Sequence, residues 1–273
     1  MSSIATFFDE ISLSIGKNKV NNREESAYTM GFLCLIWGAI FFFVIGLLKG
    51  GEFYFSLASL PTFGIRAFLE IIQAHITMLA VVKADRTTFN FIRVGTLPLL
   101  FIVDLLMGYA IDAKQMLGIG IIVLAFIIIL LSRELGKKGF GLVLFTAINA
   151  VVTISLYKYN ITNFNSVEAE QGIIYAILII YFFLVAHCVA KENPLRFLKK
   201  PIFFTQSITQ GVGGVIESFA YSFGPASIIL AAKRSSAILW STLSGNFYFK
   251  EKHILFKLFL FTFLTAGIVL LVL

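Results

Sequence analysis

The sequence predicts an all-α protein that crosses a membrane about ten times. Of its 273 residues 58% are hydrophobic and only 14% are charged, whereas about a quarter of the residues in soluble domains are charged. The apolar residues come in blocks of about 20, the helical length that crosses a hydrocarbon core of about 30 Å. The blocks lack period-two alternation, which excludes an outer-membrane barrel. The net charge of +7 comes from short basic connections and does not indicate a nucleic-acid partner.

Nine blocks are long enough to be membrane helices, and a shorter segment precedes them. The nine ranges are 28–48, 57–82, 88–109, 114–132, 139–157, 170–190, 201–222, 225–247 and 254–273. Residues 2–16 are too short to cross alone, so we interpret them as a trimmed first helix. This segment contains Asp9 and Glu10 and has no basic residues ahead of it, so we do not expect a signal peptide. Cys34 and Cys188 lie in apolar blocks and are expected to be small buried hydrophobic residues.

Basic residues between the blocks predict the orientation. Fifteen of them fall in the odd-numbered connections, whereas the even-numbered connections hold only Lys49, Lys114 and Lys158. Because Lys and Arg accumulate on the cytoplasmic side, the odd-numbered connections are expected in the cytoplasm. We expect an integral protein of a bacterial or archaeal cytoplasmic membrane.

The two halves share a pattern of proline and polar residues that indicates an internal repeat. Five positions of the third and eighth spans match at an offset of 140: Pro61 and Pro201, Arg66 and Gln206, Glu70 and Gln210, Gln73 and Gly213, and Thr77 and Glu217. The fourth and ninth spans align at an offset near 137, with Gly108 over Gly245. Five helices are an odd number, so the second copy is expected to be inverted, as in many secondary transporters. We predict an N-terminal repeat over 1–136 and a C-terminal repeat over 137–273.

Two adjacent cations, Lys233 and Arg234, lie inside the predicted ninth span. Charges at bilayer depth are costly and usually face a bundle interior or a wet cavity. Adjacent helical residues point about 100° apart, so one protein carboxylate does not serve both. Arg offers a fork and Lys a point charge to phosphate or carboxylate. The pair therefore predicts an anion-binding site.

The other polar residues within spans are candidates to assist this site or to neutralise it. The expected substrate-binding residues are Lys233, Arg234, Arg66, Arg93, Gln206 and Gln210, and the candidates for charge pairing or proton coupling are Glu70, Glu217, His75 and Asp104. Arg66 and Glu70 are four residues apart and can bridge each other. Arg93 and Asp104 are too far apart along one helix to pair, so each needs a partner from another helix. Glu217 precedes Lys233 across a short turn, so antiparallel packing can bring the two together.

The stretches 85–132 and 224–253 resemble the repeat of the drug/metabolite transporter superfamily, in its EamA-like branch. The matching features in the first stretch are Pro98, Gly108 before a short charged turn, and Gln115 with Gly118. In the second they are Gly245 and the sequence Lys250-Glu251-Lys252. The resemblance implies ten helices in two inverted repeats that work by alternating access. Related triose-phosphate translocators grip phosphate with an adjacent Lys-Arg pair, which Lys233 and Arg234 match.

These features predict a secondary transporter of a small anionic metabolite, with a proton or a counter-substrate as a further partner besides the bilayer. The alternatives are an exporter of amino acids or amphiphilic compounds with structural charges, a membrane-embedded enzyme that uses Glu217 or His75, and a non-transporting membrane scaffold or sensor. The sequence has no Walker loop, no nucleophile elbow, no zinc-protease motif and no cysteine pair at ligand spacing. We therefore expect no enzyme activity, no cofactor and no metal.

Overall fold

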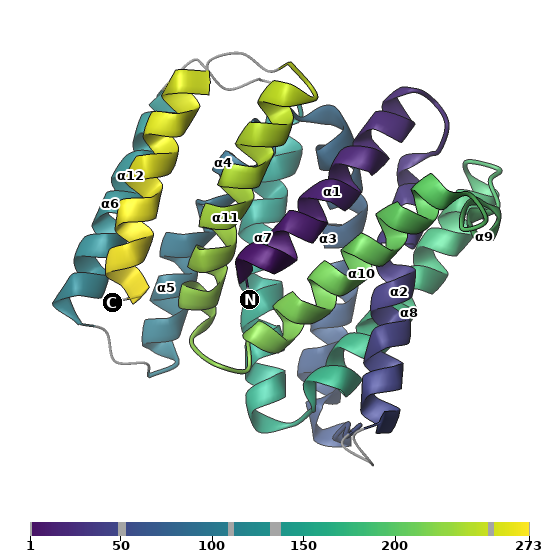
Figure 1. Ribbon diagram of the computed structural model, residues 1–273. Coiled ribbons are helices and arrows are strands. Elements are labelled where there is room, and N and C mark those ends of the chain that lie inside the picture. The colour runs from purple at the N-terminus through teal and green to yellow at the C-terminus, as the bar shows by residue number, and fades with distance from the viewer. Residues whose placement is uncertain (1, 49–52, 109–111, 132–137, 251–253, 273) are drawn as a thin grey trace.

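The computed structural model describes residues 2–48, 53–108, 112–131, 138–250 and 254–272, and within them the chain forms helices joined by short connections (Figure 1). The helices are α1 (Ser2–Asn21), α2 (Ala27–Leu48), α3 (Leu60–Lys83), α4 (Arg86–Arg93), α5 (Thr96–Leu106), α6 (Ala113–Leu131), α7 (Phe140–Asn163), α8 (Val167–Cys188), α9 (Pro194–Phe197), α10 (Pro201–Ala220), α11 (Ala226–Phe247) and α12 (Ile254–Val272), with a 3-10 turn, η1 (Leu57–Ser59), before α3. The described residues contain no strand, so the all-α class is confirmed.

The expected span 88–109 corresponds to the segment Arg86–Leu106, but not to one uninterrupted helix, because the helix is interrupted at Val94 and Gly95 into α4 and α5. Pro98 has no N–H to donate to the carbonyl of Val94, and the N–H groups around the break bond three residues back instead of four. The break places Arg93 in the last turn of α4, where the helix dipole favours a cation.

Several residues lie elsewhere than the sequence suggested. Lys17 and Lys158 lie inside α1 and α7, which extend beyond the predicted ends, and Lys257 lies in α12. Lys17 and Lys158 are buried, and each donates to a backbone carbonyl of another segment. The assignment of these lysines to loops was therefore wrong. Cys34 is buried as expected, whereas Cys188 at the end of α8 is exposed.

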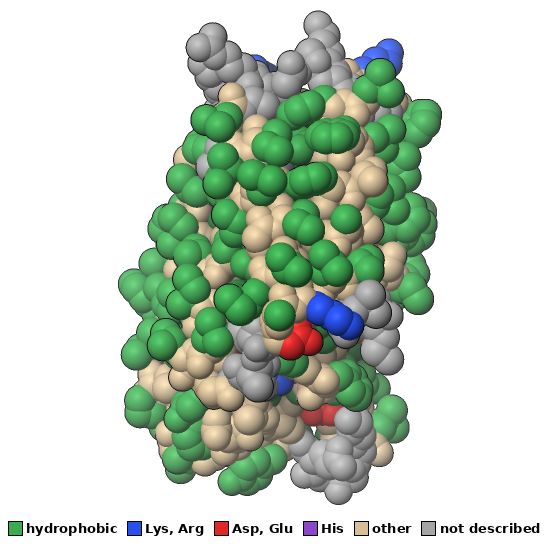
Figure 2. All heavy atoms as spheres, turned by 90° about the vertical axis from the view of Figure 1, so that its left-hand side faces the viewer, with side chains coloured by type: hydrophobic (Ala, Val, Ile, Leu, Met, Phe, Trp, Pro, Cys, Tyr) green, Lys and Arg blue, Asp and Glu red, His purple; other side chains and the backbone are tan. Residues whose placement is uncertain are grey.

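Five helical segments are long and apolar enough to cross a membrane. They are Ala27–Leu48, Leu57–Lys83, Arg86–Leu106, Phe140–Asn163 and Val167–Cys188. Shorter apolar segments lie in α6 and α12, whereas α1, α10 and α11 do not meet this criterion of length and hydropathy. Hydrophobic side chains cover most of the face shown in Figure 2, with few charged groups among them. These features are those of an integral membrane protein.

The helices pack in pairs across the molecule. Helix α2 packs against α8 at one edge and α6 packs against α12 at the opposite edge (Figure 1). Between these edges, α1 lies against α10 and α11, and α7 lies against α3 and α4. The centre of the molecule is therefore enclosed by helices from both halves of the chain.

Close packing of α1 against α10 depends on Gly213. A Cβ atom at this position would lie 2.4 Å from Oδ1 of Asp9 and 2.8 Å from the carbonyl oxygen of Ala5. Small residues let membrane helices approach closely enough for dispersion contacts and polar contacts to form. The absence of a side chain at Gly213 therefore brings the Asp9 carboxylate into the centre of the bundle.

Candidate functional site

A polar cavity with two chambers lies at the centre of the bundle. The chamber of about 190 Å³ is bordered by α1 and α4 and is called the α1 chamber; the chamber of about 250 Å³ is bordered by α3 and α7 and is called the α3 chamber. Arg93, Tyr175, Glu217, Lys233 and Arg234 line both chambers. The two chambers therefore share a wall, and charged side chains stand where they meet.

Among the residues that the structure describes, Arg93 and Arg234 are the two cations of this cavity without a counter-ion. Arg234 is only 1% exposed, and the Nε atoms of both residues are buried without a hydrogen-bond partner. Among the described residues, neither guanidinium forms an ion pair, although the Arg93 guanidinium lies over the ring of Phe89, 5.0 Å from its centroid. A buried cation without a counter-ion is costly, so an anion that accepts hydrogen bonds from both would be stabilised here.

Lys233 is engaged by carboxylates, which departs from the expectation that it binds an anion together with Arg234. Its Nζ donates to Glu217, and an Asp9 oxygen lies 3.8 Å away. The expected proximity of Glu217 and Lys233 is confirmed. Gln210 lines the α1 chamber and donates to Asp9 at 2.7 Å, so this amide orients a carboxylate. The pair of cations that is open to a ligand is Arg234 with Arg93.

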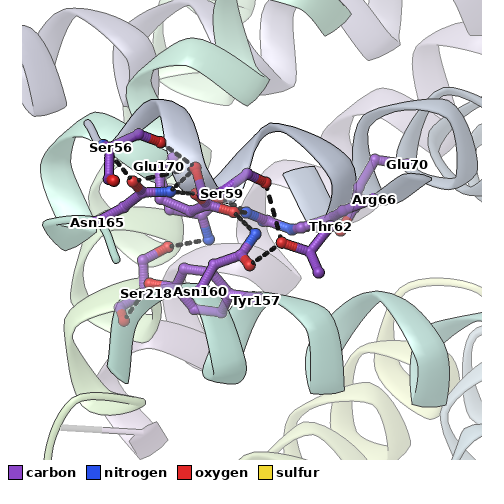
Figure 3. Close-up of polar contacts among 11 residues, drawn as sticks. Ser56, Ser59, Thr62, Arg66, Glu70, Tyr157, Asn160, Asn165, Glu170 and Ser218 are labelled. Atoms are coloured by element: carbon purple, nitrogen blue, oxygen red, sulfur yellow. Dashed lines mark hydrogen bonds and ion pairs between the residues drawn. The ribbon is translucent and has the colours of Figure 1, made fainter. Parts of the chain in front are cut away.

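Arg66 is fixed by a carboxylate that the sequence analysis did not single out (Figure 3). Its Nη1 lies 2.6 Å from Oε1 of Glu170, and its Nη2 donates to Oε1 of Gln171 at 2.9 Å. The expected partner, Glu70, is more distant, with 3.8 Å between Nε and Oε1. The guanidinium also lies 4.5 Å from the centroid of the Tyr157 ring. Arg66 therefore borders the α3 chamber as part of a rigid wall.

Glu170 is the centre of a network that joins α3, α7 and α8 (Figure 3). It is fully buried, and its oxygens also accept hydrogen bonds from Asn160 and Asn165. Asn165 in turn accepts from the N–H of Ser56 at 2.9 Å and contacts Ser59. A buried carboxylate with this many donors is compensated, so the network closes this end of the cavity.

A second compensated pair, Glu10 and Arg86, lies in the α1 chamber. Arg86 donates through Nη2 to one Glu10 oxygen at 2.6 Å and through Nε to the other at 3.1 Å. This two-pronged geometry is the strong form of an Arg-carboxylate contact. Ser244 of α11 also donates to Glu10, so the pair ties α1 to α4 and α11.

The structure places three predicted site residues outside the cavity. His75 points to Tyr181, with 2.6 Å between Nδ1 and the hydroxyl oxygen. Asp104 accepts from the N–H of Ser227 at 2.9 Å, in the first turn of α11. Gln206 is fully buried between α10 and α1 and does not reach either chamber. Neither a relay through His75 nor a substrate contact by Gln206 is supported by this geometry.

Sequence reasoning missed Asp9, Glu10 and Glu170. The first two lie in a weakly apolar N-terminal segment that suggested a trimmed helix, and Glu170 is an ordinary acidic residue in a first helical turn. The one available signal for Glu170 was its position as the first residue of the predicted span 170–190, where a carboxylate requires a partner.

The chemistry of the cavity is that of charge recognition. Among the described residues, no group of three or more His, Cys, Asp or Glu side chains is placed to hold a metal ion. No protein-family model matches the chain, and no curated protein matches it.

Proposed function

We propose that this protein is a secondary transporter that moves a small anionic metabolite, bearing a phosphate or carboxylate, across the membrane by alternating access. The observation that carries the proposal is the pair Arg93 and Arg234, which stand without counter-ions where the two chambers meet. An anion at this point takes hydrogen bonds from both guanidinium groups and is reached from either chamber. Its chemistry favours phosphate or carboxylate, because both accept forked hydrogen bonds.

The architecture we propose is ten membrane helices in two inverted repeats, residues 1–136 and 137–273. The packing supports it, because α1 contacts α10 and α11 much as α7 contacts α3 and α4, and corresponding helices pair as α2 with α8 and α6 with α12. The starts of α2 and α8 add support. Ser26 accepts from the N–H of Thr29, and Ser166 accepts from the N–H of Ala169, so both caps keep the offset of 140 residues.

Two further features favour transport. The break between α4 and α5 lies beside Arg93, and interrupted helices near the membrane centre are typical of transporter binding sites. The resemblance to the drug/metabolite transporter superfamily implies the same mechanism in a cytoplasmic membrane, in which the two repeats rock around the site. Glu217 and Asp9 hold Lys233 while the site is empty.

One observation favours a second candidate, an exporter of amino acids. Lys233 is bound to carboxylates as a structural charge would be, and Glu70 is 21% exposed at the edge of the α3 chamber. Such a carboxylate can receive an amino group while Arg93 and Arg234 receive a carboxylate. This candidate uses the same two arginines but requires a positive group on the substrate.

Uptake by proteoliposomes tests the proposal. Inorganic phosphate, small carboxylates and amino acids are compared as substrates for the unchanged protein, for Arg234→Gln and for Lys158→Gln. Lys158 is a buried cation outside the cavity that donates to a backbone carbonyl, so its variant is a matched control. The proposal expects anion flux that Arg234→Gln abolishes and Lys158→Gln preserves. Flux confined to amino acids supports the second candidate, and no flux of any compound favours a membrane scaffold.

A further inference from the structure

The two ends of the bundle carry related but unequal polar groups. Ser26 and Ser166 begin α2 and α8 at the same offset of 140 residues, and the same offset relates Glu25 to Asn165 and Gln206 to Arg66. One end, which we call the Arg66 end, is closed by the network around Glu170. The other, which we call the Glu25 end, is formed by α1, α2 and α10 and has a neutral amide where the Arg66 end has a guanidinium.

Glu25 is a buried carboxyl group that forms no side-chain hydrogen bond with the described residues. Its side chain is 3% exposed, and neither oxygen has a hydrogen-bond partner among the described residues. Gln206, which is fully buried, is the polar side chain that faces it, and both polar atoms of that amide also lack a partner within hydrogen-bond geometry. A buried ionised carboxylate without donors is costly, whereas a protonated carboxyl group is far less so.

The charges around Glu25 do not compensate it. Glu192 and Glu24 are the neighbouring carboxylates, and Lys19 is the neighbouring cation. Lys19 is already paired with Glu24 at 2.8 Å, and Glu192 accepts from the backbone and hydroxyl of Ser26, so its negative charge is held in place. Cys34 of α2 is the other titratable group that faces Glu25. Burial raises the pKa of the Glu25 carboxyl to about 8, and the charge of Glu192 adds to the effect.

We propose that Glu25 is a proton-binding site that controls the Glu25 end of the bundle, beside the α1 chamber. The end stays closed while the carboxyl group holds its proton against Gln206. When the proton leaves to the aqueous phase, the carboxylate requires water, and the turn between α1 and α2 separates from α10. The ligand of this site is a proton, because one carboxyl and one amide do not supply the oxygen cage that a metal cation needs.

This inference rests on the proposed alternation between two faces and adds the coupling ion and the gate. At the Arg66 end, Glu170 is paired with the guanidinium of Arg66 at 2.6 Å, an arrangement that Glu25 does not have. The closed state holds the Glu25 proton more tightly than an open, hydrated state with an ordinary carboxyl pKa. Raising the pH therefore favours opening between about pH 5 and pH 8, by up to about tenfold per unit, and the effect levels off above pH 8.

The two native cysteines provide the readout. Cys34 is buried and borders the α1 chamber, whereas Cys188 is exposed and reports the intrinsic reactivity of a free thiol at each pH. The purified full-length protein is labelled with a maleimide at pH 5.5 to 9, and mass spectrometry gives the ratio of labelling at Cys34 to that at Cys188. We expect this ratio to rise with pH up to about pH 8 in the unchanged protein.

Two variants decide the interpretation. Glu25→Gln has no proton to lose, so its ratio is expected to stay low at every pH. The matched control is Asp112→Asn, which removes the charge of an exposed carboxylate just before α6 and is expected to keep the response. Gln206→Arg places a guanidinium at the position that corresponds to Arg66. It is expected to hold Glu25 ionised and to keep the end closed at every pH. This second variant keeps the test informative if Glu25→Gln does not fold.

The proposal is overturned if Glu25→Gln responds to pH as the unchanged protein does, or if the ratio in the unchanged protein is flat. A response to sodium ions at constant pH overturns the assignment of the proton as ligand. Because labelling does not measure flux, failure here is distinguishable from failure of the proposed transport.

Discussion

The substitution Glu170→Gln tests how strongly the network around Arg66 stabilises the bundle. Glu170 is fully buried and lies 2.6 Å from the Arg66 guanidinium. Removing its charge leaves Arg66 with one carboxylate, Glu70, whose oxygen is 3.8 Å from Nε. Removing one partner of a buried pair costs about 3–5 kcal/mol. At about 2–4 °C per kcal/mol for a chain of this size, the melting temperature should fall by roughly 6–20 °C.

Glu70→Gln is the matched control, because the same substitution is made in a partner of the same arginine. The Glu70 side chain is 21% exposed, and its ion pair with Arg66 is long. Partly exposed pairs contribute about 0–1 kcal/mol, so we expect a shift of at most a few degrees. Thermal unfolding of both variants in detergent micelles, followed by intrinsic fluorescence, measures the difference. Equal shifts for the two variants, or an unchanged melting temperature for Glu170→Gln, would refute the reasoning.

Three further predictions concern the cavity. Arg234→Gln should weaken anion binding by about 10- to 100-fold, because it removes charge-assisted hydrogen bonds of about 1.5–3 kcal/mol. Without ligand its melting temperature should not fall, because the substitution removes a buried cation that has no counter-ion among the described residues. Ligand-induced thermal shifts measure both. Gly213→Ala should destabilise the fold by about 1–3 kcal/mol, because the new Cβ would clash with Asp9. Gly64→Ala should leave the stability unchanged, because the space around its Cβ is open. Denaturation midpoints of the two variants measure the difference. His75→Gln should leave anion affinity unchanged because the residue lies outside the cavity, and a loss of flux with normal expression would contradict this.

The positions of the helices were predictable because apolar blocks and connections alternate clearly along the chain. The break between α4 and α5 was not predicted, although Pro98 and Gly95 both lie in that stretch. Helix α4 is polar and α5 is apolar, but a window long enough to detect a membrane span averages over both pieces, so hydropathy does not reveal the change of hydrogen-bond pattern. The length of α1 was underestimated because its polar residues suggested that the helix ends early. Its polar residues are satisfied by partners on other helices, and such compensation is not visible in one segment.

The candidate site was predictable in its cations and in the pair of Lys233 with Glu217, but not in the pairings that Asp9, Glu10 and Glu170 form. The doublet Lys233 and Arg234 correctly marks helix α11 as a wall of the cavity. Lys233 is held by Glu217 and also by Asp9, which α1 places 3.8 Å from it. That contact depends on close packing against Gly213, about two hundred residues away in the chain. Long-range contacts of this kind follow from the assembled fold and have no local signature.

The cavity has equal numbers of cations and carboxylates, but the carboxylates are distributed unevenly among the cations. The cations are Arg66, Arg86, Arg93, Lys233 and Arg234, and the carboxylates are Asp9, Glu10, Glu70, Glu217 and Glu170, which binds Arg66 from behind the wall. Lys233 and Arg66 each have two carboxylates nearby, whereas Arg93 and Arg234 have none in contact. An anion that binds the two free arginines therefore adds negative charge to a group that is formally neutral. Protonation of one of the two carboxylates beside Lys233 or Arg66 removes that excess negative charge, because the cation still has its second carboxylate as a partner. We therefore expect anion binding and proton binding to favour each other in this cavity.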